Sequence, residues 1–336
     1  MRLTIYQDAS LFSELQSEWN SLLYRSTHNR IFSTWEWQST WWEAYHPGDL
    51  WAIAIHDEND QLIGIAPWFI EHNQEQGLIV HSIGCVDVSD YLDLIIDRDH
   101  VEQVLAALTD HLQAHRDMFD SLDLCNIAED SETITRLPRL LKQAGFTATY
   151  TQQEVCPIIN LPGDWEEYVA NLGKKYRHEL RRKLRRAEGA TEKLDWYIVG
   201  PEHNLDEELE RFLELMAASH QEKAGFLEDE QNVMFFKKIS PILFKRGWLQ
   251  LSFLTVDGTA AAAYLNFDYD NQILVYNSGL LPGAFGHLSP GIVLLGHNIR
   301  YAIENRREIF DFLRGNETYK YQMGGQDTRL FKLEAH

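Results

Sequence analysis

The chain has 336 residues, of which 44% are hydrophobic and 12% aromatic, so it is not a disordered chain, and two domains are expected. Its net charge of −21 is uneven: residues 1–155 carry 8 basic and 25 acidic side chains, and residues 156–336 carry 22 and 26. The acidic first half disfavours a DNA partner, whereas the second half tolerates an anionic ligand. No apolar run of about 18 residues is present, and the N-terminus lacks the pattern of an export signal. We therefore predict no membrane span and a cytoplasmic location.

The cysteines and one histidine pair give no metal-site pattern. Cys85, Cys125 and Cys156 lie far apart in apolar, strand-like runs, which predicts buried structural thiols rather than a disulfide framework. His111 and His115 lie one helical turn apart, but no third ligand is identifiable, so a surface pair is expected. No metal cofactor is predicted.

In the first half, the pattern of apolar residues predicts strands at 51–55, 62–70 and 91–96, a helix at 101–116 and a strand at 119–123. Tryptophans at helical spacing predict a packing face made of Trp35, Trp37, Trp41 and Trp42. Ser89 to Asp93 is polar at the mouth of a strand, and Asp90 and Tyr91 are candidate substrate-binding residues there. A simple strand cap is the alternative.

The second half repeats the order of the first. Strands are predicted at 249–256, 259–268, 272–280 and 310–314, with a helix at 291–305 before the last strand. The offset of roughly 190–200 residues indicates a duplicated unit. A hairpin followed by strand, helix and strand predicts an α/β (α+β) fold with a mixed sheet in each unit. Because a strand-like segment at 147–161 links the two units, we place the domains at 1–155 and 156–336.

The segment KKYRHELRRKLRR (174–186) carries eight Lys or Arg in thirteen residues. On a helix its apolar residues form one stripe, with ladders of cations beside it. Lys174, Arg177 and Arg181 are therefore candidates for binding an anion, such as cofactor phosphates or tRNA. The alternative is a solvated surface helix.

A turn at 286–291 precedes the helix of the second unit. Ser289 suits an N-cap, Pro290 suits the first helical position, and Gly291 permits close backbone approach. Because a turn of this kind presents free amides, it is a candidate phosphate seat. An ordinary capped helix is the alternative.

Polar residues follow the last strand of the second unit, where open α/β sheets place ligands. Asp311 and Glu317 are candidate general bases, Tyr319 a candidate proton donor, and Lys320 a candidate cationic stabiliser. The alternative is an ion pair of Asp311 with Arg314 and packed tyrosines. No P-loop, GxSxG or GxGxxG motif is present, which argues against a nucleotide kinase, an α/β-hydrolase and a Rossmann dehydrogenase.

Three segments, 165–186, HLSPGIVLL (287–295) and FDFLRGNETYKYQMGG (310–325), resemble the GNAT-fold acetyltransferase domain of CelD/BcsL-like cellulose-biosynthesis proteins. That family is related to the Fem-type peptidyltransferases, which also pair two GNAT-like domains. The resemblance implies tandem GNAT-like domains and acyl transfer from acyl-CoA to an amine or hydroxyl. In the Fem relatives the donor is aminoacyl-tRNA. Lys320 corresponds in position to a lysine that Fem-type enzymes use to stabilise the transition state.

The resemblance and the residues together predict an N- or O-acyltransferase whose C-terminal domain is catalytic and whose N-terminal domain is not. Direct attack by the acceptor is expected, because no Ser or Cys has a recognisable base partner. The donor is acetyl-CoA or another acyl-CoA, and the acceptor is a small molecule or a cell-envelope or polysaccharide precursor. The residues predicted to bind the donor are Asn277, Ser278, Gly279, Leu280, Ser289, Pro290, Gly291 and Arg314.

Two alternatives of other kinds stay open. The Q/R-x-x-G-x-G/A pyrophosphate loop of ordinary GNAT enzymes is not intact, which keeps a Fem-like aminoacyl-tRNA-dependent peptidyltransferase in consideration. The sequence has no heptad segment for a coiled coil, which argues against such a peptidyltransferase. The other alternative is a non-catalytic module that binds an anionic metabolite.

Overall fold

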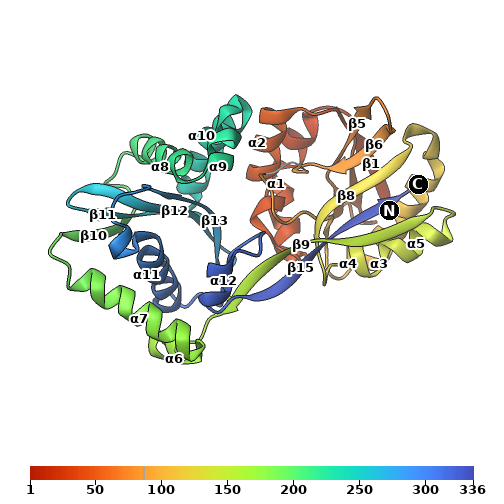
Figure 1. The fold of residues 1–336 in the computed structure, drawn as a ribbon. Helices are drawn as coiled ribbons and strands as arrows, with labels where there is room; N and C mark the ends of the chain where they lie inside the picture. Colours follow the sequence, from red (N-terminus) through yellow and green to blue (C-terminus); the bar gives the residue numbers. More distant parts are fainter. Residues whose placement is uncertain (86–87) are drawn as a thin grey trace. The chain divides into compact units, whose positions relative to one another are not determined.

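The computed structural model describes residues 1–85 and 88–336 and divides into two compact units (Figure 1). Unit 1 comprises Met1–Val155 with Thr328–His336, and unit 2 comprises Cys156–Asp327. Strand β15 (Gln326–Ala335) pairs antiparallel with β8 (Ser121–Ala128) of unit 1. The last nine residues, expected in the second domain, therefore lie in unit 1, because a pairing over such a sequence distance leaves no local pattern.

The elements of unit 1 that precede residue 156, the last of them continuing to Asn160, are β1 (Arg2–Tyr6), α1 (Ser10–Arg25), η1 (Ile31–Ser33), α2 (Trp35–Tyr45), β2 (Asp49–Leu50), β3 (Ala52–His56), β4 (Leu62–Ala66), β5 (Trp68–Asn73), β6 (Gly77–Ser82), β7 (Ile95–Ile96), α3 (Val101–Ala114), η2 (Arg116–Met118), β8, α4 (Glu132–Thr135), α5 (Leu137–Gln143) and β9 (Ala148–Asn160). One sheet has the order β1-β3-β4-β7, and a second group of strands has the order β15-β8-β6-β5-β2. The paired strands of unit 1 run antiparallel, except β6 and β8, which run parallel.

Two strand predictions in this unit are wrong. The single strand expected at 62–70 is two strands, because Pro67 has no N–H to donate and the chain moves from one sheet to the other there. The strand expected at 91–96 is only the two-residue β7, and the strand parallel to β8 is β6. The repeated motif is therefore a strand, a helix and a parallel strand, formed by β6, α3 and β8.

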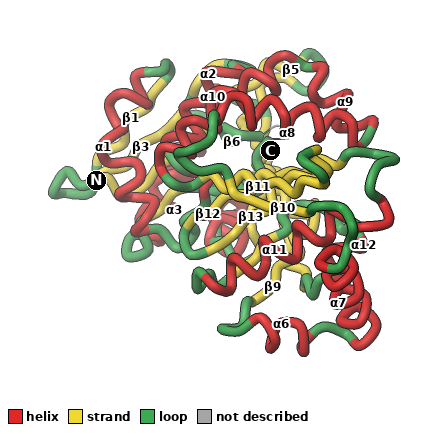
Figure 2. The backbone as a smooth tube through the Cα atoms, turned by 90° about the vertical axis from the view of Figure 1, so that its left-hand side faces the viewer, coloured by secondary structure: helices red, strands yellow, loops and turns green. Residues whose placement is uncertain are grey.

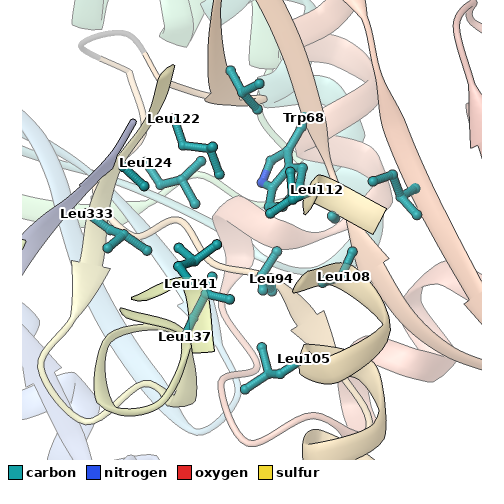
Figure 3. Packing of buried hydrophobic residues seen from close by; sticks show 14 of the residues in the cluster. Trp68, Leu94, Leu105, Leu108, Leu112, Leu122, Leu124, Leu137, Leu141 and Leu333 are labelled. Atoms are coloured by element: carbon teal, nitrogen blue, oxygen red, sulfur yellow. The ribbon is translucent and has the colours of Figure 1, made fainter. Parts of the chain in front are cut away.

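The core of unit 1 confirms the predicted amphipathic helix α3, whose apolar face is buried. Leu105, Leu108 and Leu112 lie in one hydrophobic cluster with Leu122 of β8 and Leu333 of β15 (Figure 3). The C-terminal strand is thus part of this core. In the predicted tryptophan face, Trp37, Trp41 and Trp42 are buried, with Trp37 against Phe32 and Trp41 against Phe69, whereas Trp35 is half-buried.

Two side-chain predictions need correction. Cys85 and Cys125 form a disulfide across 40 residues of sequence, whereas Cys156 is a free, buried thiol. Cys85 follows β6 and Cys125 lies on β8, so the pairing arises from strands that become neighbours only in the fold. His111 is buried against Trp51 rather than on the surface, and this burial lowers its pKa.

Unit 2 contains the end of β9 followed by α6 (Trp165–Asn171), α7 (Lys174–Glu188), β10 (Leu194–Ile198), α8 (Leu205–Ser219), α9 (Gln221–Glu228), α10 (Glu230–Arg246), β11 (Leu249–Val256), β12 (Thr259–Tyr269), β13 (Gln272–Leu280), η3 (Gly286–Leu288), α11 (Pro290–Glu304), β14 (Ile309–Asp311) and α12 (Thr318–Gln322). Its strands have the order β10-β11-β12-β13-β14-β9, and only β13 and β14 are parallel. The predicted mixed sheet is confirmed.

Helices cover both faces of the unit 2 sheet. In Figures 1 and 2, α8 and α10 lie on one side of β11–β13, and α11 with α7 lies on the other. The basic helix α7 packs on α11, where Leu180 and Leu184 lie close to Gly296. The apolar stripe predicted for 174–186 therefore faces α11, and its cations are left on the outside.

Candidate active site

The parallel pair of unit 2 opens shortly after it forms. β13 and β14 pair at three positions, ending at Leu274 opposite Asp311, while β13 continues along β12 to Leu280. Tyr276 is an extra residue in this second pairing and makes a β-bulge. Bulges often lie beside active sites, where they redirect side chains. The opening at the carboxyl ends of β13 and β14 is where an open α/β sheet is expected to bind a ligand.

The loop after β14 is held by two of the predicted catalytic residues. Asp311 is buried, and its Oδ1 accepts a hydrogen bond from the Leu313 N–H at 2.7 Å. Lys320 is only 2% exposed, and its Nζ donates to the carbonyl oxygens of Leu313 (3.1 Å), Arg314 (2.6 Å) and Gly315 (3.1 Å). The Lys320 Nζ also lies 3.0 Å from Glu317 Oε2. Asp311 and Lys320 thus fix the shape of the loop.

Two phenols belong to the same region. The ring of Tyr319 packs edge-on against Phe312, and burial raises the pKa of Tyr319, with Tyr264 and Glu317 adding to the effect. Burial also raises the pKa of Tyr264, which lies on β12 opposite Ser278. Both phenols therefore keep their protons at neutral pH. Sequence reasoning missed Tyr264, because a single tyrosine in an apolar strand gives no functional signal.

Lys223 is a second residue that the sequence did not reveal. It lies on α9, and its Nζ donates to the carbonyl oxygen of Ser278 at 2.6 Å and contacts Ser278 Oγ at 3.2 Å. Burial lowers the pKa of Lys223 to about 8, against the raising effect of Glu317. The segment QEKAGFLE contains no motif, so only the docking of α9 beside β13 brings this amine to the opening.

The β13 residues that were predicted to bind the donor also make packing and hydrogen-bond contacts within unit 2. Asn277 Oδ1 accepts a hydrogen bond from the Ser278 N–H at 3.0 Å. A Cβ atom at Gly279 would lie 2.6 Å from the backbone N of Met216, so glycine is required there by the packing of α8. Leu280 extends to Gly291, where an added Cβ would lie 2.8 Å from its Cδ2. The end of β13 and the start of α11 are therefore in direct contact.

The start of α11 differs from its prediction in one respect. Pro290 occupies the first turn as expected, but the Ser289 side chain makes no capping hydrogen bond. Ser289 has a left-handed backbone with φ of 54°, whereas an N-cap serine needs extended backbone to reach the amides of the first turn. Ser289 therefore occupies the predicted N-cap position, but its side chain does not cap the first turn of α11.

The basic helix meets this turn at its C-terminal end. Arg186 donates to the carbonyl oxygen of His287 at 2.9 Å. Arg181 pairs with Glu166 at 2.8 Å, and Arg177 donates to the Ala170 carbonyl oxygen. With a rise of about 1.5 Å per residue, Lys174 lies about 18 Å along the helix from Arg186. The predicted anion-binding residues are thus spread away from the turn, and Arg186 is the cation that reaches it.

Asp90 and Tyr91 belong to unit 1. Both are buried, and the Arg30 guanidinium lies 4.7 Å above the centre of the Tyr91 ring. Their binding of an acceptor stays a prediction. Within residues 1–85 and 88–336, no three His, Cys, Asp or Glu side chains cluster in a way that could hold a metal ion. The same residues contain no helix with the length and apolarity to cross a membrane.

Comparison with known proteins agrees with this architecture. Residues 174–321 match the family described as an acetyltransferase (GNAT) domain, so this part of unit 2 is similar to GNAT-type domains. No curated protein matches the chain.

Solved structures show the same fold over nearly the whole chain. The structure of FemX is 12% identical with a TM-score of 0.66, covering 99% of this chain and 97% of its own. L-PGS from Bacillus licheniformis is 11% identical with a TM-score of 0.55, covering 98% and 92%. A tandem GNAT protein from the clavulanic acid biosynthesis pathway is 12% identical with a TM-score of 0.50, covering 99% and 98%. The predicted fold of tandem GNAT-like α/β domains is confirmed.

Proposed function

We propose that unit 2 transfers an acyl group from a thioester donor to an amine or hydroxyl by direct attack. The observation that carries this proposal is the opening of β13 from β14 just before the bulge at Tyr276, within a GNAT-type domain. A pantetheine arm carries amide groups that can hydrogen-bond to a free strand edge as an added strand does. The donor arm would thus lie along Asn277 to Leu280.

The donor is proposed to be acetyl-CoA or another acyl-CoA. Its phosphates would meet the first turn of α11, at Ser289 to Gly291, because that turn has no side-chain cap and Arg186 contacts His287 just before it. Membership of the CelD/BcsL-like group stays a proposal, supported by the motifs at 287–295 and 310–325.

The predicted catalytic residues take different roles in this proposal. Tyr319 would donate a hydrogen bond to the leaving thiolate, since its phenol stays protonated. Glu317 would supply negative charge at the opening, where its side chain is 57% exposed. Asp311 and Lys320 would hold the loop after β14, because their polar atoms are already engaged there. The acceptor is proposed to be a small molecule or an envelope precursor in the cytoplasm.

A Fem-like aminoacyl-tRNA donor is the second candidate. The similarity to FemX over 99% of the chain and the cations along α7 favour it. A non-catalytic binding module would show neither acyl-CoA turnover nor tRNA-dependent transfer.

Calorimetry with acetyl-CoA separates these candidates, and α7 offers a matched pair of variants. Arg186→Ala removes the cation at the turn and is expected to weaken acetyl-CoA binding by about tenfold. Arg182→Ala is the control, because Arg182 is paired with Glu179 on the same helix at 2.6 Å. If both variants bind acetyl-CoA with the same affinity, the proposed phosphate site is wrong. Salt-sensitive tRNA binding without acetyl-CoA binding would favour the Fem-like donor.

A further inference from the structure

Two lysines border the opening between β13 and β14, and their surroundings differ. Lys320 comes from α12 and has four oxygen atoms within 3.1 Å of its Nζ, three carbonyls and the Glu317 carboxylate. Lys223 comes from α9, and its polar contacts among the described residues are with the two oxygens of Ser278. Environments that favour different protonation states of neighbouring groups are typical of acid–base sites. Lys320 is therefore enclosed by acceptor oxygens, whereas Lys223 has fewer oxygen partners and is the amine that can release its proton.

The contacts of Lys223 are compatible with a neutral amine. The Ser278 carbonyl oxygen can only accept, so it takes one N–H of Lys223 in either protonation state. The Ser278 hydroxyl can take a second. If both N–H groups of a neutral Lys223 are bound to Ser278, its lone pair is left to accept a proton. A charged Lys223 would have a third N–H at that position instead. The same contacts with Ser278 would hold the amine in place during proton transfer.

The other titratable groups of the opening are less suited to accept a proton. Asp311 is buried and engaged with the Leu313 N–H, and Glu317 is paired with Lys320. Tyr264 and Tyr319 keep their protons. Their environments leave Lys223 as the group with a proton to exchange near neutral pH.

We propose that Lys223 is the general base of this site and takes the proton of the acceptor amine or hydroxyl as it attacks the acyl carbon. This inference rests on the proposed acyl transfer. The new N–C or O–C bond forms as the C–S bond of the donor breaks, and the thiolate leaves with the electron pair of that bond. The proton of the acceptor passes to Lys223 Nζ and from there to solvent.

The charges around Lys223 support this role. Its hydrogen-bond partner on β13 is Ser278, which is uncharged. The Glu317 carboxylate, in the loop before α12, interacts with it electrostatically. Among the described residues, no charged group of α8 or α10 is found to act on it. Because its pKa is about 8, a useful fraction of Lys223 is neutral at physiological pH, as a general base requires.

Competitive labelling with acetic anhydride tests the state of Lys223 without any turnover. The wild-type protein is labelled from about pH 6 to about pH 10, and the labelled peptides are quantified by mass spectrometry. Labelling of Lys223 should rise with a midpoint near pH 8 and fall when CoA is added, while labelling of Lys175 on α7 serves as the internal reference. A Lys223 midpoint equal to that of Lys175, or no protection by CoA in a protein that binds acetyl-CoA, would overturn the proposal.

Kinetics test the role of the amine. Thiol release from acetyl-CoA is measured with a panel of primary amines and alcohols as acceptors, and kcat/KM should rise with pH through about pH 8. Lys223→Met should lower kcat about 100-fold with little change in the KM for acetyl-CoA. Lys223→Arg retains a cation that cannot act as a base, so it should lose activity equally. The control Lys237→Met removes an exposed lysine of α10 that pairs with Glu210.

The two proposals fail in different ways. If Lys223→Arg keeps the wild-type rate and pH profile, Lys223 is a structural cation and the base assignment is wrong, while acyl transfer stands. If the wild type neither binds acetyl-CoA nor releases thiol with any acceptor, the proposed acyl-CoA function fails. A labelling midpoint near pH 8 in that same protein would still support Lys223 as a neutral amine.

Discussion

The parallel strand pairs of the two units end differently. In unit 1, β6 and β8 pair in parallel at two positions, and Cys85 beyond β6 is joined to Cys125 of β8. Residues 88–92 also bind to the end of β8, with the Leu92 N–H donating to the Asn126 carbonyl and Asn126 Nδ2 donating to the Ser89 carbonyl. In unit 2, lysines and phenols border the corresponding opening.

Under the proposed function, this difference would leave one unit able to bind a donor and the other unable to do so. The disulfide and the buried segment occupy the ends of β6 and β8, so in unit 1 the position corresponding to a donor arm is taken by the chain itself. Unit 1 is also the strongly acidic part of the chain, which disfavours a polyanionic donor. These features support the proposal that unit 1 is non-catalytic.

The largest effect is expected from removing the cation that holds the opening of unit 2. Lys320→Met leaves three carbonyls and Glu317 without their ammonium partner, which should lower the free energy of unfolding by about 4 kcal/mol. Chemical denaturation measures the change. Lys332→Met, which removes a partly exposed lysine paired with Asp123 in unit 1, is the control and should cost less than 1 kcal/mol, about the value of a surface pair. A similar cost for both variants would contradict the structural role of Lys320.

Opening the closed end of unit 1 should have a slightly smaller effect. Cys85→Ser removes a cross-link that closes a loop of 40 residues, and the expected loss in the free energy of unfolding is about 3 kcal/mol. Acetyl-CoA binding measured by calorimetry should not change, because the donor is assigned to unit 2. Cys156→Ser is the control for a buried cysteine without a disulfide. Loss of acetyl-CoA binding in the Cys85→Ser variant, but not in the control, would contradict the division of roles.

The smallest effect is a gain in stability. The folded state holds Lys223 with a pKa of about 8, below the value of 10.5 for an unperturbed lysine, so it disfavours the charged form. The unfolded state binds more protons between these two values, and the contribution of Lys223 to stability rises with pH across this window. Lys223→Met should therefore be more stable than the wild type at pH 7, by about 2 kcal/mol.

Thermal unfolding of both proteins at a series of pH values checks this expectation. The difference between them should shrink as the pH rises from about 8 to about 10, because the folded wild type has then released the proton of Lys223 and no longer holds a charged amine in a buried site. A difference that does not depend on pH would show that Lys223 is not held in a desolvated site.

The sequence predicted the periodic elements of unit 2 well. The alternating and apolar runs at 249–256 and 272–280 became β11 and β13 with the same bounds, and the cationic run became α7. These predictions succeeded because each depends on which side chains share one face of a local element. The predictions at 62–70 and 91–96 were wrong, because Pro67 and the choice between two sheets decide those segments.

The candidate site was predicted only where its residues are close in sequence. Asp311, Glu317, Tyr319 and Lys320 lie at the end of one strand or just after it, so a motif could indicate them, and their catalytic roles stay a prediction. Lys223 has no such signal, because it comes from a helix about 50 residues before the strand it contacts.

The sequence alone therefore determined the two-unit α/β plan, the basic helix and the polar strand end, since local periodicity and composition encode them. The tertiary structure decided the disulfide of unit 1, the bulge and opening of β13, and the different environments of Lys223 and Lys320. Each of these depends on which distant segments become neighbours, and on how much water remains around a charge once they do.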